Sequence, residues 1–462
     1  MKLAALTAVV ILACLGAVMS RWRSPEERVN WPTRLAVLAV AGLFLGNFVI
    51  VLQGGVLQSG MLQGEASTER TGDLGVYLRA AWAAGLGEDI YQATDSHGWH
   101  YLYPPLLASL LVPFADPPES APSAARAAAI PYGVSLGLWY WLGVGCLLVS
   151  VNTVASALAR ADSVVARTRF SQGWWNDRLL PLLIVLPFAL DGLRRGQTTA
   201  IILLCLAGCS TAILRGRSLR AGAWLGAAAA LKLFPLYLLI YPLWRRDGRF
   251  LAAALAVAFV ASLIPVVVMG WAPALSAYRT FVTGRLAGEA SGAGNATVVE
   301  ELHGTNAGVQ SFEYMIYDTL HPDRASRAPA PPQGYFFAHI ALSLVLTAAA
   351  LWAMRRRRDR FGEYLFFAAL VMLAIPMLPV ARPHYYLLGM LAVAGLFVDV
   401  SVPAVGWRSA RFVAAAGFAF LAAAILDAAR MEWALDFGVA SLAALVIAAL
   451  ALDKARRVAV LS

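Results

Sequence analysis

Lysine is nearly absent from this chain of 462 residues, which holds only Lys2, Lys232 and Lys454. Charged residues of all kinds make up 14% of the sequence, whereas hydrophobic residues make up 60%. Such a composition excludes an ordinary soluble protein, in which about 25% of residues are charged. The net charge of +10 comes from arginines in short segments between apolar runs, so it does not indicate nucleic-acid binding. The chain is therefore predicted to be an integral membrane protein.

Cysteine and histidine are also scarce. The four cysteines all lie in apolar stretches, and no further thiol or histidine accompanies the pair Cys205 and Cys209. They are interpreted as small packing residues, without a disulfide framework. The closest histidines, His97 and His100, make only a pair, whereas a metal site ordinarily has three or four ligands. We therefore expect no bound metal and no cofactor.

Long apolar runs dominate what is present. Runs of about 17–25 residues predict membrane-spanning helices. The candidates are residues 3–19, 35–57, 131–155, 197–214, 250–270, 335–354, 361–380, 385–400, 411–429 and 436–453. The predicted fold is all-α and polytopic, with about 11–13 transmembrane or half-spanning helices in one integral membrane domain over residues 1–462.

Three further apolar stretches do not make complete spans. Residues 101–115 reach only about 22 Å at helical rise, and residues 179–190 are also too short for a hydrocarbon core of about 30 Å. The run 221–244 is predicted to bend at Phe234–Pro235, because proline removes a helical hydrogen bond. Short and broken helices are tolerated in a membrane where they line a protein cavity. These stretches therefore favour a cavity over a simple bundle.

Arginine-rich short loops predict the orientation, because they stay on the cytoplasmic side. They lie at residues 21–34, 215–220, 245–249, 355–360, 408–411 and 454–457. The outer face then receives two longer segments, 58–100 and 271–334. Both are too short for ordinary independent domains, so we expect them to pack as caps over the membrane part. The orientation between residues 101 and 178 stays open.

Lys232 is the most unusual residue of the spans. It has eleven uncharged residues before it and twelve after it in the run 221–244. A cation at membrane depth costs roughly 2.5–3.5 kcal/mol, so it usually faces a protein interior and an anion. This predicts a site at Lys232. The alternative is a lysine that snorkels to the lipid headgroups.

Asp73 stands at the start of residues 74–86, which are predicted to form an amphipathic helix on the outer surface. As a helix N-cap it would accept backbone hydrogen bonds. A capping role does not exclude catalysis, because a cap also fixes the position of a carboxylate. Other polar residues fall at the predicted outer ends of spans, where Arg194 and Arg195 break the positive-inside trend. These residues are Arg194, Arg195, Gln197, Asn306, Gln310, Arg382 and His384.

One carboxylate and several cations on the outer face of a polytopic protein suit the transfer of a sugar from a lipid-linked phosphate. A carboxylate accepts the proton of the acceptor hydroxyl as general base. Cationic side chains stabilise the leaving phosphate. An enzyme that uses nucleotide sugars would need a cytoplasmic soluble domain, and none is predicted. A transporter or flippase of lipid-linked sugars is the alternative, although it would more often place charge pairs deep in several spans.

Several short motifs, in this order and spacing, resemble glycosyltransferase family 87. They are Asp73-x-x-x-Tyr77, Ile90-Tyr91, Tyr101-x-Tyr103-Pro104-Pro105, Gly196-Gln197, Lys232-x-x-Pro235 and Trp244-Arg245-Arg246. The resemblance implies a GT-C fold and an inverting hexosyltransferase of the EC 2.4.1 type, which moves mannose from a polyprenyl-phosphate donor to a lipid or glycan acceptor. Related enzymes of the same fold transfer arabinofuranose, and the sequence does not separate these two donors.

The resemblance also assigns roles to residues. Asp73 is the expected general base. The expected donor-binding residues are Lys232, Gln197, Arg194, Arg195, His384 and Arg382, and the expected acceptor or pocket residues are Tyr77, Tyr103, Asn306 and Gln310. Asn306 and Gln310 are separated here, whereas the family tends to have a compact Asn-Gln-Ser run. The expected location is the plasma membrane of a bacterium, with the site facing outside and membrane lipids around it.

Overall fold

The structure is a computed structural model. It describes residues 2–19, 29–53, 72–95, 98–161, 168–286, 309–323, 326–328, 331–355, 359–398, 407–429 and 431–457. Within these ranges the regular elements are helices, apart from one isolated bridge between Thr94 and His100. The predicted all-α class is confirmed.

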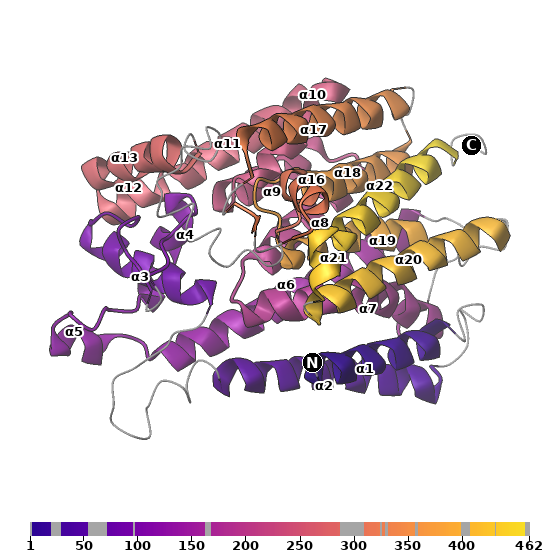
Figure 1. Cartoon of the computed structure of the whole chain (residues 1–462), viewed down its shortest axis with the longest axis horizontal. Coiled ribbons are helices and arrows are strands. Elements are labelled where there is room, and N and C mark those ends of the chain that lie inside the picture. The colour runs from indigo at the N-terminus through magenta and orange to yellow at the C-terminus, as the bar shows by residue number, and fades with distance from the viewer. Residues whose placement is uncertain are drawn as a thin grey trace.

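The longer helices lie side by side in a bundle (Figure 1). They are α1 (Lys2–Met19), α2 (Trp31–Leu52), α6 (Tyr132–Ala161), α7 (Gln172–Arg194), α8 (Thr199–Leu214), α9 (Ser218–Leu231), α11 (Gly248–Ser262), α17 (Gln333–Ala353), α18 (Arg360–Ala374), α19 (Met390–Val398), α20 (Trp407–Ala428) and α22 (Val439–Arg457).

Shorter helices connect or cover them. They are α3 (Asp73–Leu86), α4 (Pro105–Leu110), η2 (Val112–Phe114), α5 (Ser123–Ala128), η3 (Phe234–Leu239), α10 (Ile240–Arg245), α12 (Ile264–Met269), α13 (Trp271–Thr280), η4 (Phe281–Leu286), α16 (Phe312–Leu320), η6 (Pro383–Gly389) and α21 (Glu432–Asp436).

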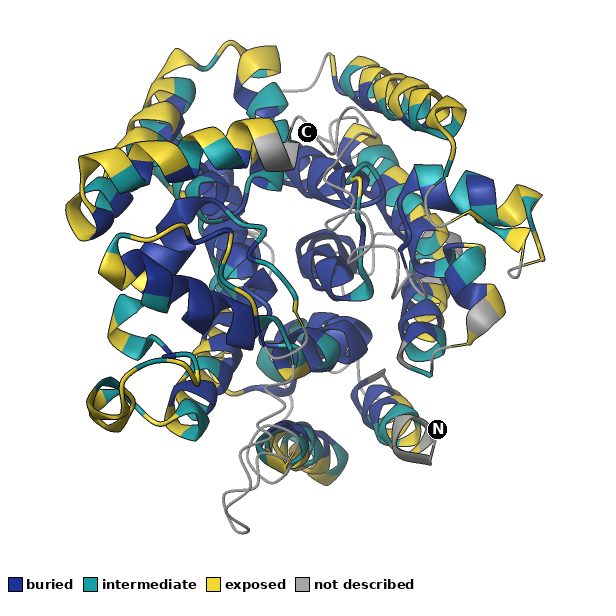
Figure 2. Cartoon of the chain, turned by 60° about the vertical axis from the view of Figure 1, so that its left-hand side comes forward, coloured by how far each residue is buried: buried dark blue, intermediate teal, exposed yellow. Residues whose placement is uncertain are grey.

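Four helical stretches are long and apolar enough to cross a membrane by themselves: Trp31–Leu52, Ser123–Arg160, Gly248–Met269 and Gln333–Ala353. Most other apolar helices of the bundle are shorter than a complete span or carry polar side chains at their ends. Figure 2 shows that helices at the centre are buried nearly all round, while those at the rim expose outward stripes. On the rim, Phe259, Val267 and Leu344 are exposed apolar side chains, as expected for a surface that faces lipid.

α7 is longer than the sequence indicated. Residues 179–190 were expected to be too short for a span, but the helix runs from Gln172 to Arg194. Its polar first turns are buried because other helices supply partners: the Gln172 amide donates to the Thr33 hydroxyl at 2.7 Å, and Arg178 Nε donates to Asn152 Oδ1 at 3.1 Å. Such pairings satisfy groups that a hydropathy pattern counts as loop.

The predicted break in the run 221–244 is confirmed. α9 ends at Leu231, and Lys232 is extended, with φ −149° and ψ 134°. Pro235 explains the end point, because a proline has no N–H to donate to the carbonyl four residues earlier and its ring clashes with that carbonyl. That carbonyl belongs to Leu231. The chain therefore leaves helical geometry at the residue that carries the isolated cation.

Two glycines hold α9 against α11. A Cβ on Gly222 would meet the Phe250 carbonyl, and a Cβ on Gly226 would meet the Ala254 carbonyl. Glycines four residues apart let two helix backbones approach closely, which is a common packing mode in membranes. The helix that leads to Lys232 is thus fixed along its length.

Short helices gather at one end of the bundle. At this end, which we call the α3 end, α3 packs on η2 and α12: Gly85 lies against Val112, and Gly87 lies against the Met269 carbonyl. Figure 1 places α3, α4, α5, α12 and α13 together on this side.

The opposite end gathers arginine-rich loops, as the charge pattern predicted. Arg245 donates to Glu363 at 2.8 Å and to the Met354 carbonyl at 3.1 Å. Gly216 lies against the Arg360 guanidinium, and Lys454 lies 5.2 Å from the Phe361 ring. Loops that are far apart in the sequence therefore meet at one end.

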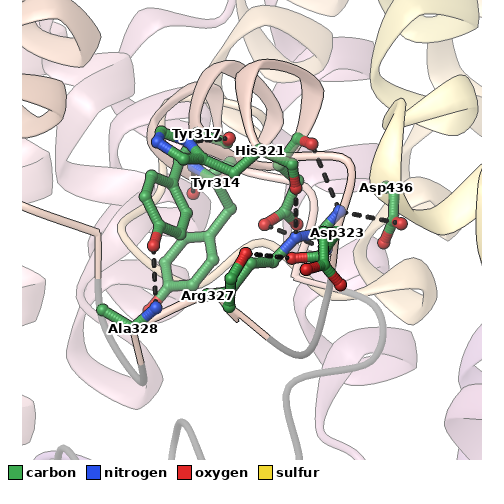
Figure 3. A network of polar contacts seen from close by, with 10 residues as sticks. Tyr314, Tyr317, His321, Asp323, Arg327, Ala328 and Asp436 are labelled. Atoms are coloured by element: carbon green, nitrogen blue, oxygen red, sulfur yellow. Dashed lines mark hydrogen bonds and ion pairs between the residues drawn. The ribbon is translucent and has the colours of Figure 1, made fainter.

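Arg327 fastens α16 to α21. Its guanidinium contacts Asp318 Oδ1 at 3.3 Å and Asp436 Oδ2 at 3.1 Å, and its Nε donates to the His321 carbonyl at 2.7 Å (Figure 3). The Tyr317 hydroxyl accepts a hydrogen bond from the Ala328 N–H at 2.8 Å. These contacts fix the described part of the 309–328 segment on the C-terminal helices.

Candidate active site

Asp73 is the first residue of α3, not its cap. Gly72 is the N-cap, and no side chain makes a capping hydrogen bond there. The expectation that Asp73 caps the helix is therefore wrong, because the helix begins one residue earlier than the cap position requires. The Asp73 N–H instead donates to the Arg195 carbonyl at 2.9 Å. The start of α3 is thus joined to the turn after α7.

Two left-handed glycines make this junction possible. Gly72 has φ +98° and Gly196 has φ +71°. A Cβ on Gly72 would lie 2.8 Å from the Arg195 carbonyl oxygen, and a Cβ on Gly196 would lie 2.7 Å from the Leu74 Cβ. The positive φ values favour glycine, and the contacts leave no room for a side chain. Both glycines are required for Asp73 to approach the 191–197 turn.

We expect Gly72→Ala to lower the free energy of unfolding by about 1–3 kcal/mol from backbone strain, because alanine is strained at this φ. The clash of its Cβ with Arg195 should add to this loss. Gly98→Ala is the matched control, because Gly98 has φ +79° but nothing within 4 Å of its Cβ position. Thermal unfolding in detergent measures both. Equal losses in the two variants would show that the contact with Arg195 has no effect.

A group of buried tyrosines lies beside Asp73. The Tyr77 ring stands edge-on to the Tyr103 ring at 5.1 Å and to the Tyr101 ring at 6.3 Å. The Tyr91 hydroxyl donates to the Tyr103 carbonyl at 2.9 Å, so the strand-like segment before α4 is held in place. Burial raises the pKa of Tyr77 and of Tyr103, so both hydroxyls stay protonated. The motif tyrosines therefore form one cluster.

Lys232 reaches into this cluster. Its ammonium donates to the Tyr103 hydroxyl at 3.2 Å, and the same hydroxyl donates to Gln197 Oε1 at 3.3 Å. The ammonium also lies 4.6 Å from the Tyr103 ring centre and 4.4 Å from that of Tyr385, both within the range of cation–π attraction. Lys232 is only 7% exposed. The structure thus favours an internal site over snorkelling to headgroups.

The charges converge on Asp73. Burial raises the pKa of the Asp73 carboxyl, and the positive charges of Arg195, Lys232 and Arg382 act in the opposite direction. The same three cations also act on His384, which is buried and has no hydrogen-bond partner for either ring nitrogen among the described residues. One carboxylate, one imidazole and three cations therefore meet at the α3 end.

Arg195 makes a further contact within its own turn. Its Nε lies 3.1 Å from Asp191 Oδ2, and both side chains are partly exposed. Asp191 thereby offsets part of the positive charge of the turn. Trp139 completes the turn, because its indole N–H donates to the Gly196 carbonyl at 2.8 Å.

Two predicted site residues, Arg194 and Gln310, have their contacts elsewhere. Arg194 contacts Asn47 Oδ1 of α2 at 3.3 Å, so its guanidinium is not among the cations that act on Asp73. The Gln310 amide donates to Asp427 of α20 at 2.8 Å. Asn306 lies outside the described residues.

Sequence reasoning missed Tyr385 and Trp139 as site residues. Both are aromatic residues near the expected ends of spans, where tyrosine and tryptophan are common without any function. Tyr385 follows His384 directly, so the position of the histidine was the only available signal. Among the residues that the structure describes, no three metal-binding side chains come together.

Comparison with known proteins finds a family, a curated relative and a solved structure to which this chain is similar. The sequence model of glycosyltransferase family 87 matches residues 101–379. A curated relative from Mycobacterium tuberculosis (strain ATCC 25618 / H37Rv), the polyprenol-phosphate-mannose-dependent alpha-(1-2)-phosphatidylinositol mannoside mannosyltransferase, is 25% identical over 437 residues, which cover 84% of this chain and 81% of the relative. The crystal structure of ArnT from Cupriavidus metallidurans bound to undecaprenyl phosphate is similar with a TM-score of 0.40 and 15% identity, over 90% of this chain and 76% of ArnT.

The family match covers more than half of the chain. It includes Tyr103, Gln197 and Lys232, whereas Asp73 lies before its first residue and His384 lies shortly after its last. The expected glycosyltransferase class follows from this match. The chain belongs to glycosyltransferase family 87.

Proposed function

We propose that this glycosyltransferase moves a hexose from a polyprenyl-phosphate donor to a hydroxyl of a lipid or glycan acceptor. The favoured hexose is mannose. The transfer inverts the configuration at the anomeric carbon. The observation that carries the proposal is the convergence of Asp73 with Lys232, Arg195 and Arg382. Support for the donor comes from the curated relative, which is polyprenol-phosphate-mannose-dependent. Family membership favours catalysis over the alternative of a transporter.

The carboxylate of Asp73 acts as general base. It accepts the proton of the acceptor hydroxyl while that oxygen attacks the anomeric carbon from the side opposite the phosphate. Attack from the opposite side inverts the configuration in one step. A positioned base of this kind contributes about 10²–10⁴-fold to the rate. The backbone bond from Asp73 to Arg195 keeps the base beside the cations that contact the donor.

The cations act on the leaving group. When the bond between the anomeric carbon and the phosphate oxygen breaks, the polyprenyl phosphate gains one negative charge. Lys232 is buried and Arg382 is partly exposed. Donors in a water-poor site stabilise developing charge more strongly than they do in water. Gln197 and Tyr103 hold Lys232 through the hydrogen bonds described above.

The proposed location is the plasma membrane of a bacterium, with the α3 end outside. The arginine-rich loops gather at the opposite end, and short loops rich in arginine usually stay in the cytoplasm. A polyprenyl donor and a lipid acceptor then both reach the site from the outer leaflet. Accessibility of Gly98→Cys to a membrane-impermeant thiol reagent in intact cells tests this orientation, with Arg217→Cys at the opposite end as the control.

Purified protein incubated with radiolabelled polyprenyl-phosphate sugars and a lipid extract tests the function. Transfer of label from polyprenyl-phosphate mannose to a lipid or glycan is the expected result. Transfer from polyprenyl-phosphate arabinose alone would assign the arabinofuranosyl alternative. Transfer only from a nucleotide sugar, with none from any polyprenyl-phosphate sugar, would contradict the proposal.

The pH profile should carry the signature of Asp73. The base works only when it is ionised, and burial raises its pKa, so kcat/KM should fall on the acid side at a higher pH than the ordinary aspartate range. Lys232 is one of the charges that lower this pKa. The residual activity of Lys232→Met should therefore show the acid limb at a higher pH than the wild type. A limb that moves to lower pH would contradict the assignment.

A further inference from the structure

A buried polar network lies behind the turn that carries Arg382 and His384. Gln310 is its centre: the side-chain amide donates to Asp427 Oδ1 at 2.8 Å, and the backbone carbonyl accepts from the Ser441 hydroxyl at 2.5 Å. The Ser441 hydroxyl also shares a hydrogen bond with the Tyr386 hydroxyl. Gln310, Ser441 and Tyr386 are fully buried, and Asp427 is 5% exposed.

This network holds the Ala381–Tyr386 turn by hydrogen bonds at both of its ends. The Gln310 N–H donates to the Ala381 carbonyl at 2.8 Å, directly before Arg382. Tyr386, which bonds to Ser441, comes two residues after His384. The residues between these two points are Arg382, Pro383, His384 and Tyr385, and three of them lie beside Asp73 or Lys232. Gln310 therefore connects α20 and α22 with the site.

His384 depends on such support. Neither of its ring nitrogens has a hydrogen-bond partner among the described residues, although the side chain is buried. Its Cβ lies 3.3 Å from the Cβ position of Gly192, and its ring packs on that of Tyr385 at 4.5 Å. The direction of the imidazole is thus set by packing and by the backbone of the turn. A shift of that backbone would move the imidazole directly.

Asp427 is a buried carboxyl group whose described hydrogen-bond partner is Gln310. A carboxyl group in an apolar helix is costly, and apolar residues of similar size usually pack there at least as well. A buried polar group of this kind is often kept because it specifies one arrangement of its neighbours. Here the neighbour is Gln310, whose amide has its direction fixed by Asp427.

We propose that Asp427, Gln310 and Ser441 are positioning residues for sugar transfer: they hold the Ala381–Tyr386 backbone so that Arg382 and His384 face the donor phosphate. Gln310 then acts through the turn and not by contact with the acceptor, unlike the role expected from the sequence. The inference rests on the proposed function, because it assigns Arg382 and His384 to the donor.

A double-mutant cycle between Asp427 and His384 tests this. Asp427→Leu should lower kcat/KM by up to about 100-fold, the effect of a misplacement of about 1 Å. Asp427→Asn should restore most of the activity, because its amide oxygen still accepts from Gln310. The double variant Asp427→Leu with His384→Ala should lose clearly less activity than the product of the two single losses, because the part of the effect that acts through His384 is already gone and only the part that acts through Arg382 remains.

The controls separate positioning from general damage. Ser441→Ala should lower kcat, whereas Ser210→Ala should not, because Ser210 is equally buried but donates to the Ala207 carbonyl of its own helix. If Asp427→Leu does not fold, the cycle is run with Ser441→Ala in its place. If the two single losses multiply in the double variant, the positioning role is refuted, whereas the proposed function is not affected. Wild-type activity of His384→Ala would refute the donor role of His384 and, with it, the proposed positioning.

Discussion

Asp73→Asn should fold normally and lose about 10²–10⁴-fold in kcat, the usual contribution of a general base. Asparagine has almost the same size, and the backbone N–H of residue 73 still donates to Arg195. The amide, however, cannot accept the acceptor proton. The measurement is the rate of label transfer from the polyprenyl-phosphate sugar, with thermal unfolding to check the fold.

Asp89→Asn is the matched control for Asp73→Asn. Asp89 lies just after α3, where Oδ1 accepts from the Tyr91 N–H at 3.0 Å. The same chemical change there should leave kcat within about twofold of the wild type, as is usual for a surface position. Full activity of Asp73→Asn would reject Asp73 as the base, whatever the control shows.

Lys232→Met should lower kcat/KM for the donor by about 10²–10³-fold, the cost of removing one group that stabilises developing negative charge. The KM for the acceptor should change much less, because in the proposed mechanism Lys232 acts on the donor phosphate. The protein should unfold at the same or a higher temperature, since methionine of similar size removes a buried charge. Initial rates at varied donor and acceptor concentrations give both constants.

Lys454→Met is the matched control for Lys232→Met. The Lys454 ammonium is partly buried and donates to the Gly395 and Leu396 carbonyls at 2.8 and 3.0 Å, but at the opposite end of the bundle. Its loss should affect stability and leave the donor constants unchanged. Equal effects of the two variants on the donor would place Lys232 outside the site.

The fold could be predicted from the sequence where hydropathy or a proline by itself determines the local structure. Pro235 predicts the helix break at which Lys232 lies, and the arginine-rich loops predict which ends meet. α7 was not readable to its full length, because Gln172 and Arg178 look like loop residues until Thr33 and Asn152 supply partners from other helices. A single sequence does not contain those pairings.

The site was readable where an ionisable residue stands in apolar surroundings. Lys232 was singled out in this way, whereas Asp73 follows a polar stretch and was singled out by its place at the start of a predicted helix and by the family resemblance. In the structure the charge of Lys232 acts on the Asp73 carboxyl. The cap assignment of Asp73 failed because Gly72, a residue without a side chain, takes that position. Gln310 was assigned to the acceptor because sequence spacing does not tell which neighbour an amide contacts; here it is Asp427, more than one hundred residues later.

The contact between Gly72 and Arg195 has a consequence for exchanging parts among relatives. Residues 72–77 and 191–197 pack tightly against each other, although more than one hundred residues separate them in the chain. A chimaera that takes α3 from one relative and the turn after α7 from another would inherit two surfaces that were never fitted to each other. Crossovers that leave both segments from the same parent should preserve turnover, and the intervening loops are then the natural place to alter acceptor choice.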